Sequence, residues 1–95
     1  MYAYVQIVDK NNKSYEDNFK ITVQKDKTLS MNYISGSMKS SFSIPCTEMQ
    51  NLSADHWYGS QQVSFSYGGC KFTFIENGFG SVDYLKKNLL QQWAA

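Results

Sequence analysis

Apolar and polar residues alternate with a period of two along most of the chain, and this pattern predicts β-strands. Gly68-Gly69 separates two such segments and is typical of a two-residue hairpin turn. The polar stretch 9–18 is expected to be a loop. About seven antiparallel strands follow from the pattern, at residues 2–8, 19–25, 28–35, 40–44, 50–57, 61–67 and 70–75.

The period changes to that of a helix in the last part of the chain. An apolar stripe with helical spacing runs along one side of this segment, formed by Val82, Leu85, Leu89 and Trp93. A helix is therefore expected over 81–93, with Ser81 as its N-cap. Because so short a helix is marginal alone in water, its stripe is expected to pack on one open end of the strand core, as a lid.

This succession of elements resembles the pleckstrin-homology (PH) superfold, and in particular its bacterial PH-like and GRAM-like domains. The similarity is one of topology and spacing and covers nearly the whole chain, from "LSMNYISGSMKSSFSIPCTEMQNLS" through "QQVSFSYGGCKFTFIENG" to "VDYLKKNLLQQW". It implies a single domain over residues 1–95, mainly β, in which a partly open barrel is capped by the C-terminal helix. A small β-sandwich with a docked helix is the structural alternative.

Composition and charge exclude several classes of function. The nine basic residues are all lysines and face eight acids, which leaves a net charge of +1, so nucleic acid is not an expected partner. The amino terminus lacks a signal-peptide pattern, and a cytoplasmic location is expected. Cys46 and Cys70 match no metal-binding spacing. We expect two reduced thiols, with a disulfide as the alternative, and no cofactor or metal.

Residues that could carry catalysis are few and poorly arranged. His56 is the single histidine, and the adjacent Asp55 would lie on the opposite face of a strand. Cys46 with His56 is a formal nucleophile–base pair that no spacing supports. Gly78 and Gly80 are expected to form a turn, because no strand follows to complete a nucleotide fold. The sequence therefore predicts no enzyme, and a small hydrolase is the remotest option.

Aromatic residues point instead to an interaction module that binds a protein or peptide partner, or a second copy of itself. The segment "DHWYGS" at 55–60 would present aromatic anchors at a hairpin tip, although packing of Trp57 in the core is the simpler interpretation of that residue. Two tyrosines in the first strand face outward and either extend that surface or line an edge strand. The candidate surface comprises His56, Trp57, Tyr58, Tyr2 and Tyr4.

The resemblance also implies an alternative function, a membrane-surface adaptor. Lipid-binding PH domains contact anionic headgroups around the loop between their first two strands. The corresponding candidates here are Lys10, Lys13 and Lys20. The same region also carries acidic residues and lacks the arginine that binds phosphate with two parallel hydrogen bonds, so membrane contact is not the favoured expectation.

Overall fold

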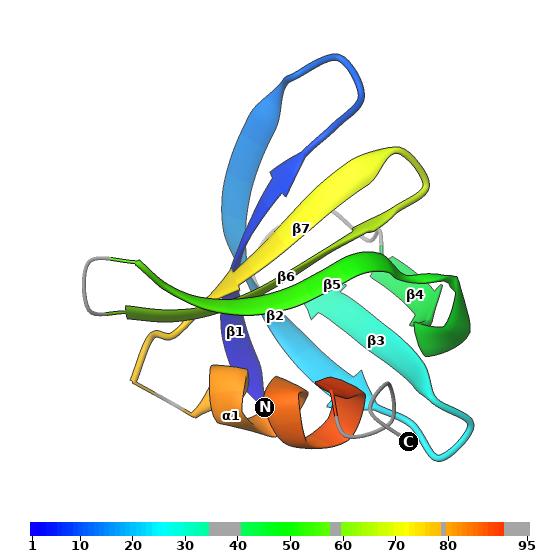
Figure 1. Cartoon of the computed structure of the whole chain (residues 1–95), viewed down its shortest axis with the longest axis vertical. Coiled ribbons are helices and arrows are strands. Elements are labelled where there is room, and N and C mark those ends of the chain that lie inside the picture. The colour runs from blue at the N-terminus through cyan, green and yellow to red at the C-terminus, as the bar shows by residue number, and fades with distance from the viewer. Residues whose placement is uncertain (35–40, 58–59, 79, 91–95) are drawn as a thin grey trace.

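The computed structural model describes residues 1–34, 41–57, 60–78 and 80–90, with the backbone alone at positions 56, 57, 60 and 90. Within these residues it forms seven antiparallel strands followed by a helix (Figure 1). The strands are β1 (Tyr2–Val8), β2 (Ser14–Val23), β3 (Thr28–Tyr33), β4 (Ser41–Pro45), β5 (Gln50–Trp57), β6 (Ser60–Tyr67) and β7 (Cys70–Ile75). A short 3₁₀ turn (Cys46–Glu48) joins β4 to β5, and α1 (Ser81–Leu85) continues into a π-helical turn (Lys86–Leu90).

The strands form one sheet in the order β4-β3-β2-β1-β7-β6-β5, curled into a half-barrel (Figure 1). The predicted fold class, a mainly β half-barrel with a C-terminal helix, is confirmed. β1 lies in the middle of the order, because it pairs with β2 on one side and β7 on the other. The suggestion that Tyr2 and Tyr4 line an edge strand is therefore wrong. The two strands that end the order are β4 and β5.

Alternate side chains of the strands fill the interior of the half-barrel. Phe42 of β4 meets Phe72 of β7 edge-on, with ring centroids 5.6 Å apart, and Phe72 stacks on Phe65 of β6 at 5.3 Å. These rings join the two halves of the sheet through the interior. The fully buried positions include Ala3, Val5, Ile7, Phe19, Ile21, Leu29, Met31, Ile44, Val63 and Phe74.

The helix closes one end of this core, as the sequence predicts. Val82, Leu85 and Leu89 are completely buried, and α1 contacts β1, β6 and β7. The backbone N–H of Val23, at the end of β2, donates to the Tyr84 hydroxyl at 2.8 Å. The fourth residue of the predicted stripe, Trp93, lies outside the described residues.

Two local predictions are wrong. Residues 14–18 belong to β2 and pair with β1. Their side chains are mostly exposed, because the pairing of β2 with β3 covers only Phe19–Val23, and they therefore show little alternation of apolar and polar residues. Ser81 is not the N-cap: Gly80 takes that position with a φ of 78°, and Ser81 is fully buried in the first turn. Other strand ends differ from prediction by one or two residues.

Candidate functional site

One edge of β5 carries backbone groups that point away from the sheet. β5 ends the strand order, so one of its edges has no neighbouring strand among the described residues. The N–H of Glu76 donates to the carbonyl of Gln61 at 3.1 Å, so the backbone groups of Gln61 point away from β5. Gln61 pairs with His56. Because such groups alternate along an antiparallel strand, those of His56 and Ala54 point out of the open edge.

The side chain of Ala54 leaves room at the same edge. Ala54 pairs with Val63, whose side chain is completely buried, so both belong to the inner face of the sheet. Ala54 is nevertheless exposed. Leu52, two residues earlier on this face, packs partly against the core. An extended backbone at this edge would therefore meet outward backbone groups beside a small side chain.

The predicted aromatic surface is divided between two strands. His56 and Trp57 are the last two residues of β5, which ends at Trp57. Tyr58 lies outside the described residues. Tyr2 and Tyr4 belong to β1, which β7 and β6 separate from β5. Three strand spacings amount to roughly 14 Å, so the tyrosines form a surface of their own.

Tyr4 is the centre of a row of side chains across the outer face of the sheet. Tyr4 pairs with Asn18 on β2 and with Ile75 on β7. Ile34 continues the row, because its N–H donates to the Asn18 carbonyl at 3.4 Å just beyond β3. Ile34 is 48% exposed, and Tyr2, one row away, is 50% exposed. Sequence reasoning missed Ile34 and Ile75, because only strand register places them beside Tyr4.

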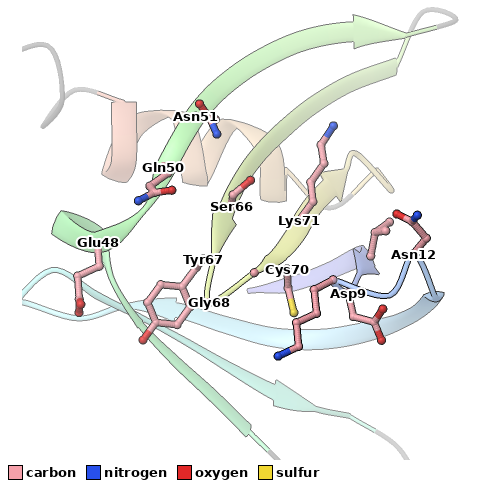
Figure 2. Close-up of a pocket in the computed structure, with 13 residues that line it drawn as sticks. Asp9, Asn12, Glu48, Gln50, Asn51, Ser66, Tyr67, Gly68, Cys70 and Lys71 are labelled. Carbon is pink, nitrogen blue, oxygen red and sulfur yellow. The ribbon is translucent and has the colours of Figure 1, made fainter.

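A polar hollow of about 920 Å³ is a further candidate site (Figure 2). Its lining comes from the β1–β2 loop, the start of β5 and the β6–β7 turn. Lys10 lies against Gly69, so the loop and the turn touch. The charged lining residues are two lysines and two acids, Lys10, Lys71, Asp9 and Glu48. In Figure 2 the labelled charged side chains extend in different directions rather than toward a common point.

Asp9 has a structural task in this hollow. Its carboxylate accepts the backbone N–H groups of Asn11 at 2.8 Å and Lys13 at 3.0 Å. These bonds hold the β1–β2 loop in its turn, which also requires the left-handed φ of 62° at Asn12. The Asp9 charge therefore lies close to the two lysines of the loop and reduces the positive potential there.

The three lysines proposed for anionic lipids do not cluster. Lys10 and Lys13 belong to the β1–β2 loop, whereas Lys20 lies near the other end of β2, paired with Tyr2. Seven residues of extended chain separate Lys13 from Lys20, a span of roughly 23 Å. One headgroup could not contact all three side chains.

Glu76 is a structural residue that sequence reasoning missed. Its carboxylate accepts the N–H groups of Gly78 at 2.7 Å, Gly80 at 3.1 Å and Val82 at 3.3 Å. Burial alone would raise the pKa of Glu76, but the hydrogen bonds from these amides outweigh it and lower the pKa. Glu76 thus performs the capping role expected of Ser81. The sequence signal that could have identified this role is the position of Glu76, a single acid just before a glycine-containing turn and a helix.

The described residues hold little reactive chemistry. Cys46 and Cys70 are free thiols, and burial raises the pKa of Cys46, which lowers its reactivity. In the described part of the chain, no three His, Cys, Asp or Glu side chains are placed to bind a metal. No helix there has the length and apolar character needed to cross a membrane.

No family model matches the chain, and no curated protein matches it. The candidate sites therefore stand on geometry alone. They are the free edge of β5, the outer-face row around Tyr4 and the polar hollow.

Proposed function

We propose that this chain is a non-catalytic interaction module with a PH-like fold, which binds an extended segment of a partner protein along the free edge of β5. The observation that carries the proposal is the outward direction of the backbone groups of Ala54 and His56. Unpaired backbone groups at a sheet edge form main-chain hydrogen bonds with an added strand. The exposed, small side chain of Ala54 permits the close approach that such bonds require.

The other sites support competing functions less well. A membrane adaptor would need convergent positive charge, but Lys20 lies far from Lys10 and Lys13 and the hollow carries equal numbers of acids and lysines. A hydrolase would need an activated nucleophile, whereas burial raises the pKa of Cys46. The edge of β5 requires only backbone chemistry, which the described residues supply.

Main-chain hydrogen bonds between β5 and a peptide would, by themselves, give only weak binding. Each contributes a net of about 0.5–1.5 kcal/mol, and ordering each peptide residue costs about 1–2 kcal/mol. Micromolar affinity corresponds to about −8 kcal/mol, so side-chain anchors must contribute. We propose Trp57 and Tyr58 for this role, because they are aromatic residues in the segment of the sequence where β5 ends, and aromatic side chains are typical binding anchors.

The test starts with peptides selected against the whole chain from a random display library. Ala54→Pro removes one outward N–H without touching the β5–β6 ladder, since proline is tolerated at such edge positions. Ala54→Ser keeps the N–H and serves as the matched control. We expect binding by titration calorimetry to weaken roughly fivefold in the proline variant, from the loss of about 1 kcal/mol, and to be unchanged in the serine variant.

The peptide backbone provides an independent readout. A bound strand uses the N–H of every second residue, so N-methylation along a selected peptide should weaken binding at alternate positions. Selected peptides that tolerate N-methylation throughout and bind the proline variant at full strength would show that β5 is not the binding edge.

A further inference from the structure

We infer that the outer face of the sheet around Asn18 binds a second copy of this chain, in a two-fold symmetric dimer. This face lies on β1, β2 and β7, whereas the proposed peptide site lies on the free edge of β5. The inference goes beyond the proposed function and does not depend on it.

The centre of the face is less polar than its surroundings. Asn18 is flanked on neighbouring strands by Tyr4 and Ile34, and Ile75 lies beyond Tyr4. Ile34 leaves 48% of its surface exposed. Isoleucine and tyrosine side chains therefore lie on both sides of the exposed Asn18, and apolar surface gathered on an outer sheet face is characteristic of contact surfaces.

Charges of opposite sign lie on the two sides of this row. Along β2, Lys20 and Glu16 each lie two residues from Asn18, and all three share the outer face. Both charged residues are exposed. Their separation along the strand is roughly 13 Å. Lys20 neighbours Tyr2, and Glu16 accepts a hydrogen bond from the Tyr4 hydroxyl, which raises the pKa of Tyr4.

This arrangement is complementary to itself. A two-fold axis along the row from Ile34 through Asn18 to Tyr4 places β2 of one copy over β2 of the other in the opposite direction. Lys20 of each copy then faces Glu16 of the other, while the row from Ile34 to Tyr4 meets its own counterpart. Face-to-face sheets pack about 10 Å apart with nearly aligned strands, and symmetric dimers use one patch twice in this way.

The charges of Glu16 and Lys20 favour a second copy of this chain over a partner whose surface is uniformly acidic or uniformly basic. A uniformly acidic or basic surface would be repelled by either Glu16 or Lys20. Two copies of the chain carry a net charge of only +1 each, so overall repulsion between them is small.

Charge exchange tests the dimer. Lys20→Glu places like charges against Glu16 of the other copy, and Glu16→Lys does the same with the sign reversed. Each variant alone should associate at least roughly tenfold more weakly than the natural chain. An equal mixture of the two restores both opposite-charge pairs, so it should form a mixed dimer at about the natural strength.

Sedimentation equilibrium of the full chain, at concentrations up to about 1 mM, measures these constants, and circular dichroism confirms folding of each variant. Lys25→Glu, at an exposed lysine in the β2–β3 turn, is the control for a change of charge elsewhere. Ile34→Ser should also weaken association. A natural chain that stays monomeric, or a mixture that associates no better than its components, would overturn the inference.

The peptide site on β5 and the outer-face dimer can be tested independently of each other. Ala54→Pro should weaken peptide binding and leave the dimer constant unchanged, whereas Lys20→Glu should do the reverse. Loss of self-association in Ala54→Pro would mean that copies pair through β5 instead, which contradicts the outer-face dimer.

Discussion

Removal of the Glu76 carboxylate should destabilise the whole domain, although Glu76 belongs neither to the buried core nor to the peptide edge. Glu76 follows β7 directly and accepts backbone N–H groups of the turn that leads into α1, among them those of Gly78, Gly80 and Val82. Glu76→Ala deprives all of them of this acceptor. The first turn of α1, which carries the fully buried Val82, then loses its fixed position against the strands.

The size of the effect follows from the number of bonds. Loss of a single N-cap side chain costs about 0.5–2 kcal/mol, and here three amides lose a charged acceptor. We therefore expect a loss of about 2 kcal/mol in the free energy of unfolding. In a domain of this size that corresponds to a fall in Tm of roughly 8–16 °C.

The effect should depend on pH in a defined direction. The folded-state pKa of Glu76 is lowered from an ordinary value of 4.5, so its stabilising contribution is fully present above that value. The contribution is lost as the pH falls through the folded-state pKa. The stability difference between the natural chain and Glu76→Ala should therefore be constant near neutral pH and shrink below about pH 4.5.

Urea denaturation followed by circular dichroism, repeated between about pH 3 and pH 7, measures this difference. Glu48→Ala is the matched control, because Glu48 is an exposed acid in the 3₁₀ turn before β5. We expect that control to stay within about 0.5 kcal/mol of the natural chain. A Glu76→Ala protein as stable as the control, or a difference that persists unchanged at pH 3, would refute the capping role of Glu76.

Three further predictions concern the lid, the core and the membrane. Tyr84→Phe removes the acceptor for the Val23 N–H and should lower the free energy of unfolding by about 1–2 kcal/mol; an unchanged thermal melt would contradict the bond. A double-mutant cycle of Phe42→Leu and Phe72→Leu should give a coupling energy of about 0.5–1.5 kcal/mol, whereas additive effects would show that the two rings do not meet. Vesicles of anionic lipid should not retain the chain at low salt in co-sedimentation; retention that Lys10→Glu abolishes would instead favour the membrane adaptor.

Some residues of the candidate sites could be predicted from the sequence, and others could not. The aromatic positions of β1 and the end of β5 were identified from their residue types. Their arrangement was not, because Tyr4 and Trp57 are separated by two intervening strands. Ile34 and Ile75 join Tyr4 only through register. Glu76 was missed because capping rules look for a short polar side chain next to the helix, and this cap lies several residues earlier.

By itself, the sequence determined the strands, the turn at Gly68-Gly69 and the buried stripe of the helix. These features are local, because a period of two or of 3.6 residues states directly which side chains share a face. Periodicity failed at Ser14–Asn18, because this part of β2 lies outside the pairing with β3 and its mostly exposed side chains need not alternate.

The tertiary structure alone decided that β1 lies in the centre, that β5 has a free edge among the described residues, and that Lys20 and Glu16 lie on either side of the row around Tyr4. All three depend on strand order and register, which are set by contacts between segments far apart in the chain. The periodicity of a single segment does not indicate which distant segments it contacts.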